Sequence, residues 1–317
     1  MAEGVMRMFY LVASIIHISN LLGQNFSSIS NGGSSQIGNE FSLNNRLYAY
    51  TTIGLDKKKK EMEYDLNIIQ ASKPKKIVFH KSKFRFLGFV KDSIILGLND
   101  DNKIYTYNTK KKGIGKKYEF TLLDETYDSF KFRLYKNQLF YLKGDSINVY
   151  NLISSRNSLV LTLEELKSQY QDIISFDVLA DTIALCLKVV DSTDISYHFC
   201  TYNSVTKKLT VVKKGEVTDS KSYVPMARFS QYGEIVYSYY SNNHTYLHFV
   251  NYKTNVERAV QDLHDYKIIN FSLSGYGTEY LSLFSEEERE KFAKENFKKL
   301  GFGGVLLGGC HVYHVFR

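Results

Sequence analysis

A short pattern recurs along this chain of 317 residues: an apolar stretch, a tyrosine, an asparagine or aspartate, and then a polar turn. It occurs as Tyr64-Asp65, Tyr107-Asn108, Tyr150-Asn151, Tyr202-Asn203 and, in altered form, Val250-Asn251. Successive pairs are 43, 43, 52 and 48 residues apart, and a second apolar run introduced by a polar turn precedes each of them. Each unit therefore predicts a strand, a turn and a strand, with a further strand on either side.

Four short strands in a unit of about forty to fifty residues are typical of a propeller blade. One blade cannot bury both faces of its sheet, so neighbouring blades must stack around an axis. The 25 Tyr and 21 Phe residues, with only 2 Pro, also favour strands. We expect an all-β fold, a β-propeller of about five to six four-stranded blades over residues 39–284, or more if the ring is incomplete. A meandering sandwich or barrel is the alternative.

The order apolar-x-apolar-Tyr-Asn-x-x-Ser/Thr-x-Lys resembles the WD-repeat pattern, in which a Trp-Asp pair closes the third strand before a short turn. The resemblance implies a WD40-like propeller without pointing to a subfamily. It also implies that the aromatic residue wedges between blades and that the polar residue hydrogen-bonds into the turn. The chain departs from the pattern because it contains no Trp and lacks the usual Gly-His pair before the blade.

The two ends of the chain do not follow the repeat. Residues 1–23 combine Arg7 with an apolar run and predict a signal peptide; an uncleaved anchor and a buried first strand are the alternatives. Residues 24–38 are polar and rich in Gly and Ser, which predicts a flexible leader. Residues 285–317 predict a C-terminal helix, with a capping box from Ser285 to Glu288, followed by a Gly-rich apolar tail outside the repeat. Either the last blade is completed unconventionally or the chain is a truncated copy of a longer propeller.

No recognised catalytic arrangement occurs in the sequence, so we expect neither an enzyme nor a cofactor. Three arginines at matching places before or within repeats, Arg85, Arg133 and Arg228, could ring one mouth of the channel and hold a carboxylate or phosphate. The alternative is that they are ordinary arginines at strand edges. The terminal Cys310, His311 and His314 lack a second cluster at a fixed spacing, so we expect no metal site.

The formal charge is +8, and lysines concentrate after the predicted third strands. The candidate basic face consists of Lys73, Lys75, Lys76, Lys110, Lys111, Lys112, Lys116, Lys117, Lys207 and Lys208. In a propeller all these turns emerge on one face, which could attract an acidic protein, an acidic glycan or an anionic lipid surface. Solvated lysines in a lysine-rich protein are the alternative. The run Lys57–Lys60 belongs to a turn on the opposite face.

Two features of the sequence depend on secretion. A hairpin turn centred on Thr193 would set Cys186 opposite Cys200, where a strained disulfide could form; two separate buried thiols are the alternative. Glycosylation acceptors occur at Asn25, Asn243 and Asn270.

Three functions from different classes follow. The first is a non-enzymatic interaction module, a secreted or secretory-pathway propeller that binds a protein or an anionic partner through one face. The second is a cytoplasmic WD-like scaffold protein. The third is a strongly diverged propeller hydrolase or lyase. We expect a protein partner first, an anionic glycan or lipid surface second, and no nucleic acid if the protein is secreted.

Overall fold

The computed structural model describes residues 27–28, 35–42, 46–56, 61–70, 73–99, 101, 103–121, 131–166, 168–191, 194–215, 225–230, 233–241, 244–262, 268–273, 279–285 and 310–315. The signal segment predicted over residues 1–23 and nearly all of the predicted C-terminal helix lie outside these residues. Within them, no helix is long and apolar enough to cross a membrane. The described residues include the short 3₁₀ turn η2 (Leu163–Glu165).

The described strands form six four-stranded antiparallel sheets, five of which use four consecutive strands. Blade 1 contains β2 (Ser35–Phe41), β3 (Leu47–Asp56), β4 (Glu61–Gln70) and β5 (Lys73–Ser82). Blade 2 contains β6 (Phe84–Lys91), β7 (Ile94–Asn99), β8 (Lys103–Asn108) and β9 (Gly113–Thr121). Blade 3 contains β10 (Phe132–Tyr135), β11 (Gln138–Lys143), β12 (Ser146–Asn151) and β13 (Arg156–Thr162).

Blade 4 contains β14 (Tyr170–Leu179), β15 (Thr182–Asp191), β16 (Asp194–Asn203) and β17 (Lys208–Lys214). Blade 5 contains β18 (Ala227–Phe229), β19 (Glu234–Ser241), β20 (His244–Asn251) and β21 (Val256–Asp262). The sixth sheet joins the two ends of the chain: β22 (Ile268–Leu273), β23 (Glu279–Ser285), β24 (Cys310–Val315) and the short β1 (Ser27–Ser28).

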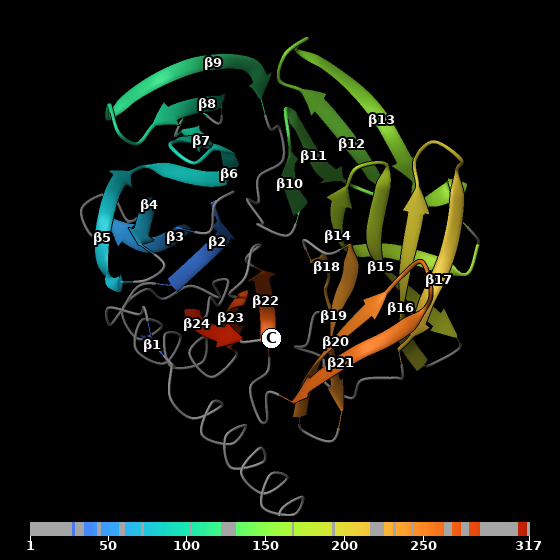
Figure 1. The fold of residues 1–317 in the computed structure, drawn as a ribbon. Coiled ribbons are helices and arrows are strands. Elements are labelled where there is room, and N and C mark those ends of the chain that lie inside the picture. The colour runs from blue at the N-terminus through green and yellow to red at the C-terminus, as the bar shows by residue number, and fades with distance from the viewer. Residues whose placement is uncertain are drawn as a thin grey trace, which may run out of the picture.

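The first strands of the six sheets form a closed ring. Each one contacts the first strand of the next sheet, from β2 through β6, β10, β14 and β18 to β22, and β22 contacts β2. Figure 1 looks along the axis of this ring, with the first strands near the centre and β5, β9, β13 and β17 at the rim. The expected propeller of five to six blades is confirmed, and the resemblance to the WD-repeat pattern holds at the level of the fold.

The sixth sheet is completed unconventionally, which was one of the two alternatives. Its third strand, β24, comes from the tail that we placed outside the repeat, and its fourth, β1, comes from residues expected to be a flexible leader. Strand β2 likewise begins at Ser35, within that leader. The expectation of a flexible leader was wrong because polar, Gly- and Ser-rich residues can still pair their backbone at a sheet edge. The expectation for the tail was wrong because β24 pairs with both β23 and β1 inside the sixth sheet.

The hydrophobic core lies between adjacent sheets. Buried clusters join blades 1 and 2, blades 2 and 3, blades 3 and 4, and blades 4 and 5. The repeated tyrosines belong to these clusters. The Tyr107 ring lies 5.2 Å from that of Phe79 in blade 1, and the Tyr150 ring stacks at 4.6 Å on Phe120 in blade 2. The repeated aromatic residue therefore wedges between blades, as the resemblance implied.

The repeated asparagine closes the turn between the third and fourth strands. In blade 2, Oδ1 of Asn108 accepts hydrogen bonds from the backbone N–H groups of Lys110 and Lys111, both at 3.0 Å. Asn151, Asn203 and Asn251 accept the same two bonds in blades 3, 4 and 5. The fourth residue after each asparagine has positive φ, between 51° and 56°, and these residues are Lys112, Ser155, Lys207 and Asn255.

The pair Tyr64-Asp65 does not occupy this position in blade 1. It lies within β4, where Tyr64 pairs with Ile53 and Asp65 with Thr52. The residue that corresponds to Asn108 is Gln70, at the end of β4 and paired with Leu47. The sequence alignment was wrong here because β3 and β4 are ten residues long, which moves the turn beyond the Tyr-Asp pair.

Candidate functional site: an axial charge cluster and a basic side

Charged residues recur at one level of the central ring. Arg133 on β10, Asp177 on β14 and Arg228 on β18 each lie two residues before the last residue that pairs across the first hairpin of its blade. Glu40 on β2 has the same relation to Ser42 in blade 1. Because first strands line the axis of a propeller, these four side chains belong to the same axial layer. We call them the axial cluster.

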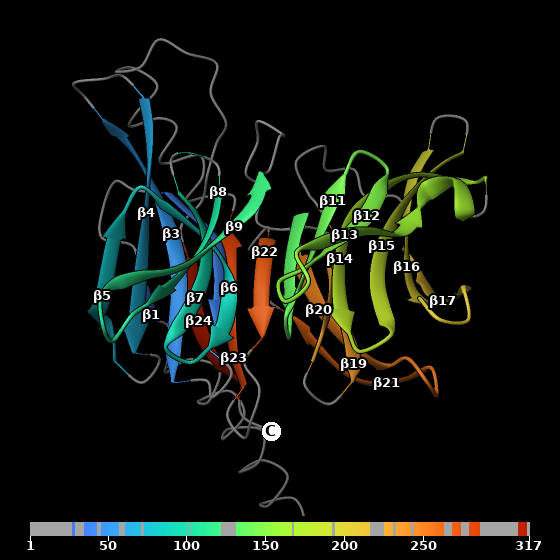
Figure 2. The ribbon, with the colours of Figure 1, turned by 90° about the horizontal axis from the view of Figure 1, so that it is seen from above.

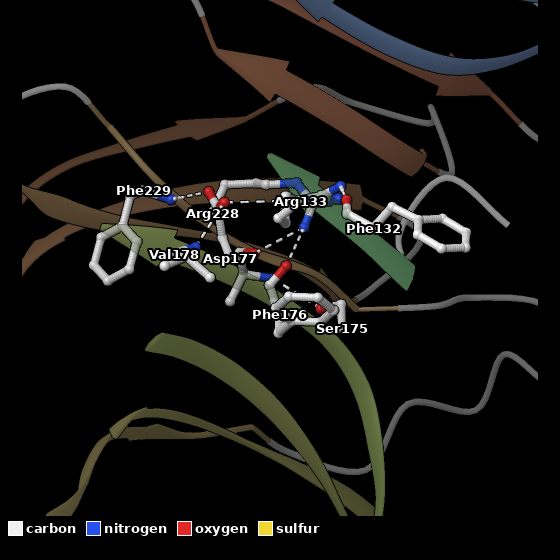
Figure 3. A network of polar contacts seen from close by, with 9 residues as sticks. Phe132, Arg133, Ser175, Phe176, Asp177, Val178, Arg228 and Phe229 are labelled. Atoms are coloured by element: carbon white, nitrogen blue, oxygen red, sulfur yellow. Dashed lines mark hydrogen bonds and ion pairs between the residues drawn. The ribbon is translucent and has the colours of Figure 1, made fainter. Parts of the chain in front are cut away.

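Asp177 links three consecutive blades. Its Oδ1 lies 3.5 Å from Nε of Arg133 in blade 3 and accepts a 2.9 Å hydrogen bond from the N–H of Val178. Its Oδ2 accepts a 2.8 Å bond from the N–H of Phe229 in blade 5, as Figure 3 shows. Burial raises the pKa of Asp177, while Arg133 and the two N–H groups act in the opposite direction. This carboxyl group is therefore engaged mainly in holding blades together.

Arg228 makes a second link between blades 4 and 5. Its side chain is 5% exposed, and Nη1 donates to the carbonyl oxygen of Phe176 at 3.1 Å. Nη1 also donates to the carbonyl oxygen of Ala227 at 3.2 Å, and the N–H of Ala227 donates to Oγ of Ser175. A buried guanidinium is tolerated here because its donors meet backbone carbonyls.

Glu40 is the member of the axial cluster that comes from blade 1. A Cβ atom added to Gly88 on β6 would lie 3.2 Å from Oε2 of Glu40 and only 2.7 Å from Cβ of Leu134 on β10, so glycine permits this close approach. Burial raises the pKa of Glu40 to about 8. The Arg133 charge and a hydrogen bond from the Phe89 backbone lower this pKa, whereas the Asp177 charge raises it.

The cluster spans the ring. Glu40 and Asp177 come from blades 1 and 4, which lie opposite each other among six, and Arg133 interacts electrostatically with both. Arg133 and Asp177 keep 19% and 18% of their side-chain surface exposed, so water reaches the cluster. The arrangement can hold or release a proton on Glu40 and fix the spacing of the blades.

The predicted ring of three arginines is only partly realised. Arg133 and Arg228 occupy matching positions, but Arg85 lies near the start of β6, at the other end of its strand. Its guanidinium stacks 4.8 Å from the centre of the Tyr64 ring in blade 1. The spacing within the sequence motif misled the prediction because β6 continues six residues beyond Arg85, whereas β10 continues only two beyond Arg133.

The structure brings half of the ten predicted basic residues to one side. Lys110, Lys111 and Lys112 are exposed in the turn between β8 and β9, and Lys207 and Lys208 are exposed where β16 turns into β17. In an antiparallel meander, turns between the third and fourth strands leave every blade at the same end. Figure 2 shows the β16–β17 and β20–β21 turns together at the lower side. Arg156 and Lys253 are exposed at the corresponding ends of blades 3 and 5.

We call this surface the basic side: it consists of the exposed Lys110, Lys111, Lys112, Arg156, Lys207, Lys208 and Lys253. Lys116 and Lys117 are exposed farther along β9, where their ammonium groups lie over the rings of Tyr118 and Tyr105. Lys73, Lys75 and Lys76 lie on β5 and not in a turn.

The opposite side of blades 2 to 4 carries acidic residues. Exposed acids lie at or near its turns and connections: Asp101, Asp145, Glu164, Glu165, Asp172 and Asp191. Lys143, Lys213 and Lys214 are exposed cations there, fewer than the acids. The turns between the first and second strands also lie on the basic side, and they carry charges of both signs: Asp92 and Asp181 are acidic and Lys136 is basic. Charge is therefore distributed unequally between the two sides of these blades.

The two cysteines of blade 4 lie on opposite faces of their sheet. Cys186 pairs with Phe199, and Cys200 pairs with Leu185, so the hairpin register differs by one residue from the expected one. Cys186 packs in the core shared with blade 5 and Cys200 in the core shared with blade 3. The candidate disulfide is therefore wrong, because a one-residue slip turns a strand side chain to the other face.

The remaining candidates carry little structural information. Asn270 lies on β22, opposite Phe284, while Asn25 and Asn243 lie outside the described residues. Cys310, His311 and His314 lie on β24. Among the side chains that the structure describes, His, Cys, Asp and Glu do not gather in any group of three that could hold a metal ion.

Glu40 and Asp177 are the site residues that the sequence did not reveal. Glu40 is the one acid of β2 and Asp177 is the second of two acids in β14, and neither has a motif around it. The available signal was position, because each precedes the first hairpin turn of its blade by the same distance. That position can be read only once the strand ends are known.

Comparisons with known proteins identify no family for this chain. No protein-family model matches the chain, and no curated protein matches it. Among solved structures, TolB from Acinetobacter baumannii is similar with a TM-score of 0.47 and 14% identity, over 71% of this chain. The chain spans about half of that structure, 53% of its length.

A second similar structure is KlHsv2 with loop 6CD replaced by a Gly-Ser linker. Its TM-score is 0.45 and its identity 8%, over 80% of this chain and 93% of that one. At these identities the likeness concerns the architecture alone. The propeller fold itself rests on the order of the strands in the six sheets, and no subfamily is identified.

Proposed function

We propose that this protein is a non-enzymatic interaction propeller that binds an anionic macromolecule through its basic side. The observation that carries the proposal is the distribution of charge: blades 2, 3, 4 and 5 all expose cations at the same turn. A repeated cation on four neighbouring blades produces a surface field larger than that of any single lysine. The exposed acids Asp181 and Glu257 lie on the same side and reduce this field, but they are fewer than its seven cations.

The turns are suited to present these charges. The asparagine at each one fixes the backbone through two hydrogen bonds, so the basic side chains project from ordered positions. Part of the charge is also tied to the blades: Nζ of Lys207 donates to the carbonyl oxygen of Val160 in blade 3 at 3.2 Å. Lys110, Lys111 and Lys112 form the densest group, which makes them the principal contact in the proposal.

The experiment is retention of the full chain on a heparin column eluted with salt. Replacing Lys110, Lys111 and Lys112 together by Gln should shift elution to clearly lower salt, because fewer phosphate- or sulfate-like charges are neutralised. The matched control is Lys103→Gln with Lys143→Gln, two cations at turns of the opposite side. Elution of the triple variant at the wild-type salt concentration would contradict the proposal.

We further propose that the protein acts in the secretory pathway or outside the cell. The support is the apolar run after Arg7 and the acceptor sequence at Asn243. N-terminal sequencing of the protein recovered from its native cell would test this. An intact Met1, with no mass shift from glycan, would favour the cytoplasmic scaffold instead.

A further inference from the structure

The basic side also carries exposed aliphatic residues in a regular arrangement. Four of the eight large apolar side chains that stand exposed in the described part of the chain lie at the turn between the third and fourth strands. They are Ile114 in blade 2, Ile153 in blade 3, Val205 in blade 4 and Val256 in blade 5, and they are 57%, 73%, 70% and 60% exposed. Each of four consecutive blades thus presents one.

Their positions follow from the turn itself. Ile153 and Val205 are each the second residue after the turn asparagine, and their N–H groups donate to its Oδ1 at 2.9 Å and 3.1 Å. Ile114 and Val256 lie at the start of the fourth strand, paired with Tyr107 and Asn251. The side chains therefore stand at the outer ends of ordered hairpins on the side that carries the cations.

A single exposed aliphatic residue is normal on a protein surface. Four at matching ends of four neighbouring blades, each close to a cation in its own turn, form a set with mixed chemistry. Apolar points beside Lys and Arg match the boundary of an anionic bilayer, where headgroup charge attracts the cations and the acyl layer accepts the apolar tips.

We infer that the basic side docks on an anionic lipid surface, with Ile153 and Val205 entering the interfacial layer and the neighbouring lysines contacting lipid headgroups. This inference rests on the proposed function and names its partner class. The shape of the surface favours lipid over an acidic protein. The tips are convex and distributed over separate blades on one side of a disc, so a continuous soft surface can contact all of them at once. A protein would need a complementary hollow at each blade.

One acidic residue limits the extent of the docking surface. Glu257 on β21 is exposed beside Val256, and its Oε2 lies 3.3 Å from Nδ1 of His248. Blade 5 is therefore the weakest part of the surface, and blades 2 to 4 form its centre.

The test is co-sedimentation of the full chain with vesicles of phosphatidylcholine alone and with vesicles containing about 30% phosphatidylserine at low salt. We expect binding to the anionic vesicles only, and less binding as salt increases. Ile153→Ser with Val205→Ser should weaken it about tenfold or more, because two aliphatic side chains no longer leave water. Lys110, Lys111 and Lys112 changed together to Gln should weaken it by a similar or larger factor.

The matched control is Ile195→Ser, an exposed isoleucine beside the β15–β16 turn on the opposite side. It should bind vesicles like the wild type. Heparin retention of the Ile153→Ser, Val205→Ser variant should remain unchanged, which shows that it is folded and keeps its charge.

Each contrary result has a defined meaning. Equal binding to both vesicle types, or wild-type binding by the Ile153→Ser, Val205→Ser variant, overturns the inference. Retention on heparin without any vesicle binding overturns the lipid inference but leaves the proposed function, with an acidic protein or glycan as partner. Loss of both kinds of binding in the wild type contradicts the proposed function as well.

Discussion

Glu40 gives the sharpest test of the axial cluster, because its protonation should make stability depend on pH. Burial raises the pKa of Glu40 to about 8, from an ordinary value of 4.5 that the unfolded chain regains. The folded state therefore holds the proton more tightly than the unfolded state. The stabilisation is fully present below about pH 4.5, declines as the pH rises, and is lost once the pH passes about 8.

The magnitude follows from that interval. At about 1.36 kcal/mol per pH unit, the span from 4.5 to about 8 corresponds to at most about 5 kcal/mol. Water reaches the partly buried side chain, which reduces the cost of ionising it. We therefore expect the effect of Glu40 on the free energy of unfolding to be about 2–5 kcal/mol.

The perturbation is Glu40→Gln, which resembles the protonated acid in shape and never ionises. Near pH 5 the variant and the wild type should unfold at similar guanidinium chloride concentrations. At pH 8.5 the variant should be the more stable by about 2–5 kcal/mol, because it avoids placing a charge in this buried position, near the Asp177 carboxylate. Comparing variant with wild type at each pH removes the contributions of other titrating groups.

The control is Glu119→Gln on β9, where the side chain is exposed. Its unfolding midpoint should follow that of the wild type across the whole range. If the wild type and Glu40→Gln gave parallel curves from pH 5 to 8.5, Glu40 would not carry a proton in the folded protein. The account of the axial cluster as a proton-holding link would then fail.

Two further predictions concern links within and between blades. Asp177→Ala should destabilise the protein by about 2–4 kcal/mol in denaturant unfolding, because Arg133 and the N–H of Phe229 lose their partner. The control is Asp181→Ala at an exposed position, which should change the free energy of unfolding little. Equal effects of the two substitutions would contradict the role of Asp177 between blades. Asn203→Ala should lower the free energy of unfolding by about 1–2 kcal/mol through loss of two turn hydrogen bonds. Asn203→Asp introduces the acid of the WD pattern and should retain most of the stability. If Asn203→Ala left the stability unchanged, the turn would not depend on these two hydrogen bonds.

The repeat could be predicted from the sequence because its causes are local. An asparagine that bonds the N–H groups two and three residues later needs only its own turn, so Asn108, Asn151 and Asn203 signal the same hairpin wherever they occur. The tyrosine before each asparagine indicates a buried strand position, because it ends an apolar run next to that turn. These local rules were sufficient for the fold class and for the side on which Lys110–Lys112 emerge.

The pairing register of the strands could not be predicted from the sequence, because it depends on contacts beyond each hairpin. Cys186 and Cys200 are symmetric about Thr193, yet the β15–β16 hairpin pairs Cys186 with Phe199. The packing of blade 4 against two different neighbours selects which face each residue takes, and one residue of slip reverses every choice. Tyr64-Asp65 was misplaced for a similar reason, since strand length in blade 1 depends on pairing between β3 and β4.

The closure of the ring and the axial cluster depend on contacts between distant parts of the chain. Strand β1 pairs with β24, which lies almost at the other end of the sequence. Glu40 lies near Gly88 of blade 2 and interacts with the charges of Arg133 in blade 3 and Asp177 in blade 4. The sequence by itself determined the blades and their turns, because short-range hydrogen bonds and periodic apolar residues specify them. Only the tertiary structure decided which strands complete the sixth blade and which charges share the axis, because both follow from how blades stack around a common centre.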